Sequence, residues 1–360
     1  MCSLEELKNY NEIKEEFSNA NILLGNGFSI NFSDTFRYKK LYDSFIRRCS
    51  DTSKKLFKGL GDTYNFEKVL ESIEIAETIC KSLNINYNEF ENHKKEIKEG
   101  LIESIKNVHP NPNPKIDDPN WPEIRDKLDL VSNQFYKFDN IFTTNYDILI
   151  YYNILYLNDK NKNKDSYNSY EDEFSDYFFS RIGCNYLDEK YTFFNNKFKY
   201  ETDSLHKHHI YYLHGALFLF EQNFNTCKIK AKNFLLDDIS KEIENNNYPI
   251  FVSEGTSNSK LKAIKSNDYL TFCLEQFENK INSNKRLVIF GHSLSAQDQH
   301  LVDIINKNCE KIAISISSDE YPTPKDLELE KDRIYKLFKT KDKEKEIYFY
   351  EAKSLFDFYN

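Results

Sequence analysis

Short runs of apolar residues that end in glycine or in small polar residues recur along the chain. The clearest are Ile22–Leu24, Ile141–Phe142, Ile210–Leu213 and Leu287–Phe290, and each predicts a buried strand followed by a turn. Apolar residues at helical spacing lie between most of these runs, for example over residues 122–135. Strands that alternate with helices predict an α/β fold, here a Rossmann-like, mostly parallel sheet with helices on both faces.

Residues 64–108 interrupt this alternation. Two long helical patterns follow each other there and end at a proline-rich segment, residues 109–114, in which a helix cannot continue. We therefore expect a Rossmann-like domain in residues 1–63 and 121–320, a helical insertion in residues 64–120, and a helix and strand extension in residues 321–360. Residues 158–203 are rich in Asn, Lys, Asp and Tyr without a clear period, and we expect a polar surface excursion there.

Composition limits the classes of function. A formal net charge of −9 argues against an extended basic surface for nucleic acid. The seven cysteines are scattered without a Cys-x-x-Cys pair, so we expect neither a disulfide framework nor a zinc module. No apolar run approaches the roughly 20 residues that span a bilayer, and the N-terminus does not resemble a signal peptide. These features predict a soluble, cytoplasmic protein that needs no metal.

The turn after the first predicted strand is a candidate for binding a diphosphate. Its residues are Gly25, Asn26, Gly27, Phe28 and Ser29. Two glycines separated by one residue let the backbone approach a diphosphate, and the following N–H groups can point at its oxygens. Ile30 stands where the full dinucleotide fingerprint has a third glycine. The turn alone is therefore also compatible with an ordinary connection between a strand and a helix.

Polar residues follow the later predicted strands. Thr144, Asn145 and Asp147 follow one strand, and His214 lies at the end of another. Gly291, His292 and Ser293 follow a third strand. Ligands of open α/β sheets bind at the carboxyl ends of the strands, so we expect these residues to meet the first turn. His214 is the candidate general base; the alternatives are a structural histidine and, for Asp147, a helix cap.

Together these segments resemble sirtuin-like proteins of bacteria. The resemblance is carried by four segments in this order: Leu24–Ser29, Thr143–Asp147, Leu213–Gly215 and Phe290–Asp298. It spans about residues 20–310. The chain looks most like a sirtuin-related bacterial family of similar length, which also shows the segments Asn65–Glu67 and Phe251–Ser257, and it is similar to the abortive-infection protein AbiH.

The resemblance implies a domain that binds NAD, with bacterial relatives that destroy NAD during phage infection. By this analogy the turn Gly25–Ser29 holds the diphosphate, Asn145 and Asp147 arrange the nicotinamide ribose and a water, and His214 is the base. Gly291 and Ser293 line the adenosine side, and Thr144 and His292 are further cofactor-binding residues. Sirtuin deacetylases carry a zinc module with paired cysteines, which this chain lacks, so removal of acetyl groups from lysine is not expected.

The expected function is hydrolysis of NAD⁺ to nicotinamide and ADP-ribose by an abortive-infection effector of antiphage defence. Loss of nicotinamide builds positive charge on the ribose, which a site with a carboxylate and a base stabilises. Cyclisation and ADP-ribosyl transfer remain open, as does a non-catalytic NAD or ADP-ribose sensor that regulates a partner. A nuclease is disfavoured by the acidic charge. Because a toxic NADase must be restrained, we expect a homo-oligomer or an activating partner protein, with residues 64–108 as a contact surface or simply as a cover for the sheet.

Overall fold

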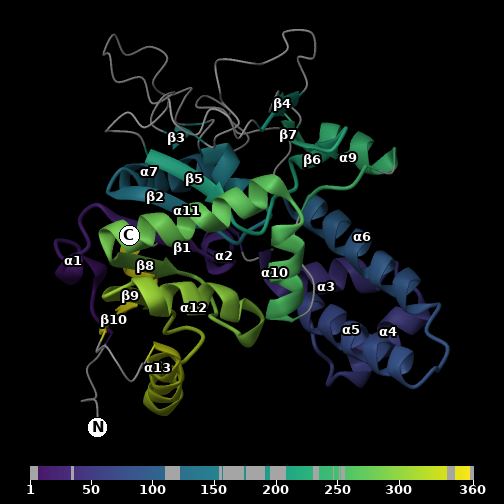
Figure 1. Ribbon diagram of the computed structural model, residues 1–360. Helices are drawn as coiled ribbons and strands as arrows, with labels where there is room; N and C mark the ends of the chain where they lie inside the picture. The colour runs from purple at the N-terminus through teal and green to yellow at the C-terminus, as the bar shows by residue number, and fades with distance from the viewer. Residues whose placement is uncertain are drawn as a thin grey trace.

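Among the residues that the computed structural model of the protein describes, seven strands form one parallel sheet (Figure 1). In spatial order they are β10 (Glu346–Glu351), β9 (Lys311–Ile316), β8 (Arg286–Phe290), β1 (Ala20–Leu24), β2 (Phe138–Thr143), β5 (His208–Tyr212) and the short β3 (Phe174–Ser175). From β1 the chain moves outward through β2 to β5, crosses back to β8 beside β1, and continues outward through β9 and β10. This is the strand order of the Rossmann fold, so the predicted fold class is confirmed.

The structure describes residues 7–33, 36–109, 122–153, 156, 174–175, 191–194, 208–229, 235–245, 247–250, 252, 256–338 and 345–356. The helices are α1 (Tyr10–Ile13), α2 (Gly27–Phe32), α3 (Tyr38–Ile46), α4 (Asp51–Gly59), α5 (Phe66–Ser82), α6 (Phe90–Val108), α7 (Pro122–Phe135), α9 (Leu235–Glu244), α10 (Ser257–Lys265), α11 (Asp268–Asn284), α12 (Gln299–Asn308), α13 (Pro324–Phe338) and α14 (Lys353–Phe356), with a 3-10 turn, η4 (Ala296–Asp298). Among the described helices, none combines the length and the hydrophobicity that crossing a membrane requires.

Aromatic side chains attach helices to both faces of the sheet. On one face, Phe28 of α2, Phe135 of α7 and Phe356 of α14 contact one another, and Phe356 also packs against Phe290 of β8. On the other face, Phe142 of β2 packs against Phe277 of α11. All five residues of β1 are buried, as expected for a central strand that is covered on both faces.

A helical lobe of α3, α4, α5 and α6 lies beside the sheet (Figure 1). Phe45, Phe57 and Phe66 pack edge to face or tilted inside it, with ring centroids 5.2–5.7 Å apart. Gly100 lets α6 approach α3 closely, because a Cβ there would lie 2.0 Å from the ring of Phe45. The helices α3 and α4, which precede residue 64, thus pack with the predicted insertion, and the predicted domain limits stay a prediction.

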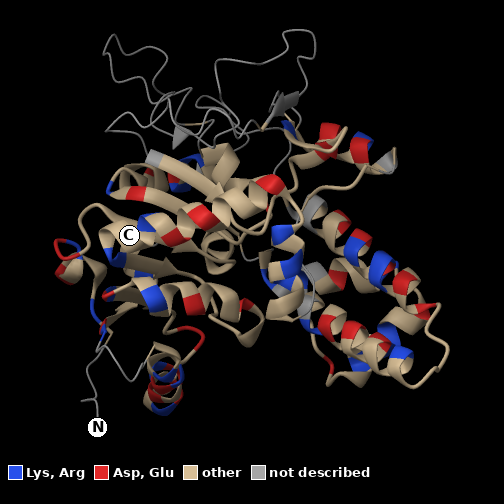
Figure 2. Cartoon of the chain, in the orientation of Figure 1, with Lys and Arg blue, Asp and Glu red and all other residues tan. Residues whose placement is uncertain are grey.

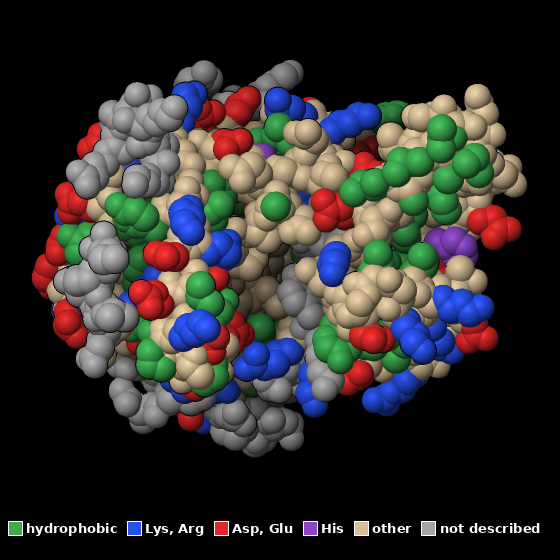
Figure 3. Space-filling model, turned by 90° about the horizontal axis from the view of Figure 1, so that it is seen from below, with side chains coloured by type: hydrophobic (Ala, Val, Ile, Leu, Met, Phe, Trp, Pro, Cys, Tyr) green, Lys and Arg blue, Asp and Glu red, His purple; other side chains and the backbone are tan. Residues whose placement is uncertain are grey.

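The lobe has an exposed apolar stripe on α5 and the loop that follows. Ile75, Ile79 and Leu83 are spaced four residues apart and are 47%, 52% and 63% exposed, and Ile85 extends the stripe. Viewed from below, hydrophobic side chains gather on the lobe at the right of the molecule (Figure 3). Elsewhere on the lobe basic and acidic side chains are interspersed rather than gathered by sign (Figure 2).

The structure also contains a small antiparallel sheet. Its order is β4 (Tyr191–Phe193), β7 (Asn225–Ile229), β6 (Leu219–Gln222), and β6 and β7 form a hairpin. The turn residues Asn223 and Phe224 both have positive φ, as a two-residue hairpin turn of type I′ requires. Glycine usually occupies at least one of these two positions. Apart from β3, β4 and Phe194, the predicted polar excursion lies outside the described residues.

Candidate functional site

A cavity of about 670 Å³ lies where the strand order reverses between β1 and β8. Among the residues predicted as a site, those on its wall are Asn26, Gly27, Thr144, Asn145, Asp147, His214, Gly291, His292 and Ser293. They come from the carboxyl ends of β1, β2, β5 and β8. The face seen in Figure 3 is hollowed near its centre. The structure thus brings together residues that lie more than half the chain apart.

The glycines of the first turn bring two backbones into contact. A Cβ on Gly27 would lie 2.5 Å from the Cα of Gly291, and one on Gly25 would lie 2.5 Å from the Cα of His292. Gly291 has φ +62°, which favours glycine. The N–H groups of Gly25 and Gly27 donate to the carbonyls of Phe290 and Gly291, at 2.9 and 2.8 Å. These two donors therefore hold the two loops together, which leaves Asn26 and the loop after β8 to face the cavity.

Three residues of the predicted first turn are not on the wall of the cavity. Phe28 is fully buried and packs among aromatic rings of the core. Gly25 contacts the loop after β8, as described above, and Ser29 lies one layer behind the wall. The contribution of Phe28 is therefore to anchor α2, whereas Ser29 acts through its neighbours.

Ser29 joins the two polar residues that follow β2. Asn145 Nδ2 donates to Ser29 Oγ at 2.9 Å, and Ser29 Oγ donates to Asp147 Oδ2. Asp147 Oδ1 also accepts the N–H of Leu149 at 2.9 Å, which is the predicted capping contact. Asn145 Oδ1 makes no hydrogen bond with a described residue, so its carbonyl oxygen is available to the cavity.

Asp147 is a buried carboxyl group without a cationic partner. It is 6% exposed and makes no ion pair within the described part of the chain. Burial raises its pKa to about 6, and the hydrogen bonds from Ser29 and Leu149 oppose only part of that shift. Asp147 is thus mostly ionised at neutral pH, with a proton affinity close to that of a general acid or base.

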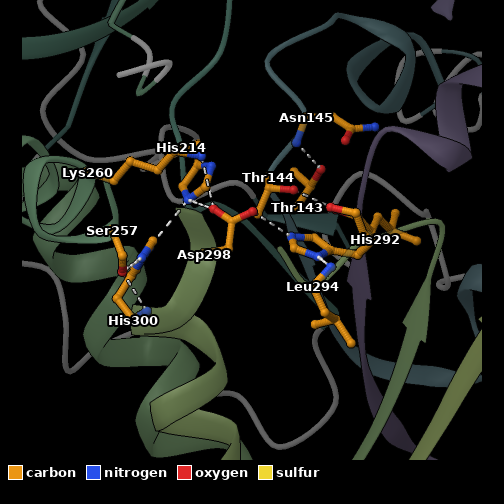
Figure 4. Close-up of polar contacts among 12 residues, drawn as sticks. Thr143, Thr144, Asn145, His214, Ser257, Lys260, His292, Leu294, Asp298 and His300 are labelled. Carbon is orange, nitrogen blue, oxygen red and sulfur yellow. Dashed lines mark hydrogen bonds and ion pairs between the residues drawn. The ribbon is translucent and has the colours of Figure 1, made fainter. Parts of the chain in front are cut away.

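His214 belongs to a second, larger buried network (Figure 4). Its centre is Asp298 of η4, whose Oδ1 accepts a hydrogen bond from Lys260 Nζ of α10 at 3.0 Å. The two side chains are 9% and 1% exposed. Burial opposes the charge of Asp298, but Lys260, through its charge and its hydrogen bond, together with His214 and His292 outweighs it and holds the pKa of the carboxyl group below its usual value.

Histidines surround this pair from three segments (Figure 4). The Nε2 atoms of His214 and His292 lie 3.8 and 3.6 Å from the carboxylate of Asp298. His292 Nδ1 accepts the N–H of Leu294 at 3.0 Å, so the proton of this ring is on Nε2 and faces Asp298. Burial lowers the pKa of His214 and of His292, and the positive charge of Lys260 lowers that of His214 further.

His214, Asp298 and His300 have the composition of a two-histidine, one-carboxylate metal site. Their potential ligand atoms lie within 4.8 Å of one another. However, the ammonium group of Lys260 already provides a positive charge 3.0 Å from Asp298 Oδ1. A metal ion would add charge beside it in a fully buried place. We therefore interpret the cluster as a hydrogen-bonded network and not as a set of metal ligands.

Sequence reasoning missed Lys260, Ser257 and His300, together with the role of Asp298. The sequence places Ser257 in a turn, and Lys260 and His300 carry no local pattern that marks them as part of a site. No local pattern distinguishes a buried lysine from a solvated one, so only the fold reveals that α10 faces His214. His109, at the end of α6, was also missed: its Nε2 accepts the N–H of Ile148 at 3.1 Å and so fixes the backbone next to Asp147.

The chain matches the model of a protein family over residues 22–355, a family described as a domain of unknown function, DUF4917. Among curated proteins, none matches the chain. The matched range extends from β1 into α14 and includes the whole wall of the cavity. The match covers most of the sequence, and the chain therefore belongs to the DUF4917 family.

Proposed function

We propose that the protein is an NAD⁺ glycohydrolase, which cleaves NAD⁺ to nicotinamide and ADP-ribose. One observation carries the proposal: Asp147, a buried carboxylate without a cationic partner among the described residues, shares a cavity with Asn145 and His214 at the switch point of a Rossmann-like sheet. Dinucleotides bind at this position in Rossmann folds. The resemblance to sirtuin-like proteins points to the same substrate.

The charge of the site suits the reaction. As nicotinamide leaves, positive charge develops on the ribose, and a fixed negative group in a water-poor site stabilises that charge. Asp147 provides such a group, because its hydrogen bonds come from neutral donors, Ser29 and the backbone of Leu149. The free carbonyl oxygen of Asn145 accepts from a ribose hydroxyl or from the attacking water. His214, kept neutral by burial, accepts the proton of that water.

The dimensions are also compatible with a dinucleotide. The cavity of about 670 Å³ falls within the roughly 300–1,000 Å³ of small-molecule pockets. Asn26 and Ser293 offer polar groups toward the phosphates and the adenosine, while Gly27 and Gly291 fix the distance between the two loops. Arg333, which also lines the cavity, is paired with Glu330 at 2.7 Å and donates to the carbonyls of Ser293 and Leu294, so its role is to hold the loop after β8.

The test is nicotinamide release from NAD⁺ by the purified full-length chain. We expect Asn145→Ala, Asp147→Asn and His214→Ala to lower turnover by at least about 100-fold, the usual contribution of a positioned acid, base or charge-stabilising group. Matched controls are Asn88→Ala and His93→Ala, which change the same residue types on the helical lobe away from the cavity. Thermal unfolding of each variant separates loss of chemistry from loss of fold.

The possible outcomes distinguish the candidate functions. Release that the site variants lose and the controls keep supports the hydrolase. Tight binding of NAD⁺ or ADP-ribose without release would identify a sensor, and Asn26→Ala would then weaken the binding. If the chain neither binds NAD⁺ nor cleaves it, alone or with proteins encoded beside it, the proposal is wrong.

The resemblance also supports a role in antiphage defence. We propose that the protein acts in the cytoplasm and that self-assembly or a partner protein activates it. Cells that carry the gene should lose NAD⁺ after phage infection and limit phage growth, and cells with Asn145→Ala should do neither. If the wild-type protein and Asn145→Ala protect cells equally, defence does not depend on the cavity. Size-exclusion chromatography with light scattering gives the oligomeric state directly.

A further inference from the structure

We infer that His214, His300 and Ser257 form a proton relay that carries a proton from the cavity to the outside of the protein. The inference rests on the proposed function and deepens it. Hydrolysis of NAD⁺ by water yields nicotinamide, ADP-ribose and one proton, which must leave the site. His214 is 2% exposed, so a base at this position needs a route by which to pass that proton on.

The three residues lie in a continuous chain (Figure 4). Nε2 of His214 and Nε2 of His300 are 3.4 Å apart. The ring centroids are 5.6 Å apart with 30° between the planes, so the rings meet through their nitrogens and do not stack. On its other side, His300 Nδ1 lies 3.0 Å from Ser257 Oγ. Ser257 is partly exposed, at the first turn of α10.

Two arrangements of the protons fit this geometry. In the first, His214 carries its proton on Nε2 and donates to His300 Nε2, and His300 donates from Nδ1 to Ser257 Oγ. In the second, every proton has moved one step: Ser257 donates to His300 Nδ1, and His300 donates from Nε2 to His214 Nε2. Ser257 Oγ also accepts the backbone N–H of His300 at 2.8 Å, which holds the hydroxyl group in place for both arrangements.

The cavity is reached through the remaining ring nitrogen. His214 Nδ1 makes no hydrogen bond with a described residue, and His214 lines the cavity wall. In the first arrangement Nδ1 has a free lone pair and accepts the proton of the attacking water. The Nε2 proton of His214 then passes to His300, the Nδ1 proton of His300 passes to Ser257, and the hydroxyl proton of Ser257 passes to solvent. One proton enters and one leaves while the products still fill the cavity, and both rings stay neutral. After product release, His214 Nδ1 loses its proton to the open cavity and Ser257 takes one up from solvent, which restores the first arrangement.

The surrounding charges favour this stepwise exchange over a stored imidazolium. Lys260 of α10, His292 of the loop after β8 and Asp298 of η4 all act on the two rings, and Asp303 of α12 acts on His300. Burial, with the charge of Lys260, keeps the pKa of His214 well below its ordinary value, and burial lowers that of His300 to about 4. A ring that does not hold an extra proton must pass one on as it takes one up.

The experiment compares His300→Gln and Ser257→Ala with the wild-type chain. Glutamine keeps a polar side chain but cannot accept a proton at one atom and release it from another. We expect kcat for nicotinamide release to fall about 100-fold in His300→Gln with KM for NAD⁺ unchanged, and the solvent deuterium isotope effect to rise. Added imidazole should restore part of the activity of His300→Ala, and Ser257→Thr should be close to wild type. The matched control is His93→Gln.

A second measurement does not depend on activity. The ¹⁵N chemical shifts of the two histidine rings report their tautomers, and Ser257→Ala should change the tautomer populations of His214, two links away. Unchanged kcat in a folded His300→Gln overturns the relay. The relay is also overturned if Ser257→Ala leaves the tautomer populations of His214 unchanged. If wild-type protein releases no nicotinamide but the tautomers are coupled, the proposed reaction fails and the proton chain stands.

Discussion

Replacing Lys260 by methionine removes the only cation that contacts Asp298 in the described part of the network. The two groups are 3.0 Å apart and their side chains are 1% and 9% exposed. Methionine fills a similar volume without charge, so lost packing contributes little. The variant therefore isolates the effect of leaving a buried carboxylate without its cation.

Proton uptake limits the size of that effect. An Asp with an ordinary pKa of about 3.9 takes up a proton at pH 7 at a cost of about 1.4 kcal/mol per pH unit, or about 4 kcal/mol. Protonation of His292, whose Nε2 lies 3.6 Å from Asp298, replaces part of the lost charge and reduces this cost. Breaking buried pairs typically costs about 3–5 kcal/mol. We therefore expect a loss of about 2–4 kcal/mol in the free energy of unfolding at pH 7.

The sign of the pH dependence follows from the lowered pKa of Asp298. In the wild-type protein its contribution is complete above the unfolded pKa and is lost as the pH falls through the folded value. In Lys260→Met the carboxyl group is already protonated or poorly stabilised. The difference between the two proteins should thus shrink by up to about 1.4 kcal/mol per pH unit from pH 7 toward pH 4.

Urea denaturation followed by circular dichroism, at pH 7 and pH 5, measures both quantities. The control is Lys262→Met, an exposed lysine on the same helix. The double variant Lys260→Met/Asp298→Leu should recover much of the stability, because the carboxylate that lost its cation is then also removed. A Lys260→Met protein as stable as the control at pH 7, or a loss that does not change with pH, would refute the reasoning.

Three further predictions concern other parts of the molecule. Acidification from pH 6.5 to about 4 should lower the free energy of unfolding by about 3 kcal/mol through His300, because its pKa is about 4 in the folded and about 6.5 in the unfolded protein, so the unfolded chain binds the proton first. Asp147, whose pKa is raised in the folded protein, offsets part of this loss. In the same urea titration, His300→Gln should lose less stability than the wild type. Gly27→Ala should lower the melting temperature, because the new Cβ would lie 2.5 Å from the Gly291 backbone. The control Gly59→Ala should not lower it, because a Cβ at that position has no neighbouring atom within 4 Å. Ile79→Lys, at a 52% exposed position, should change unfolding free energy by less than about 0.5 kcal/mol, and a larger loss would show that the stripe on α5 is covered in solution.

Apolar runs that end in glycine or in small polar residues predicted the strands β1, β2, β5 and β8, because both faces of a parallel sheet are buried. The same reasoning placed Asn145, Asp147 and His214 at one edge, since parallel strands share a direction. It did not locate the turn of the hairpin between β6 and β7, because this turn uses Asn223 and Phe224 at positive φ in place of glycine.

The network around Asp298 was beyond local patterns for another reason. The roles of Lys260 and His300 depend on Asp298, and only the tertiary fold brings these residues together. A lysine on a helix start is normally solvated, and its burial costs free energy unless a carboxylate is close. The sequence contains both groups but not the distance between them.

The contact between Gly27 and Gly291 has a consequence for how the protein is made. β1 lies between β2 and β8, so its second neighbour is a strand from the far end of the chain. At translation rates of about 5–20 residues per second, the ribosome needs on the order of tens of seconds after β1 to complete β8. During that time β1 has one open edge, which is prone to wrong pairing, and the cavity lacks one wall. A nascent chain therefore carries no complete site, and any activity of the cavity begins only after β8 and the loop that follows it have been synthesised.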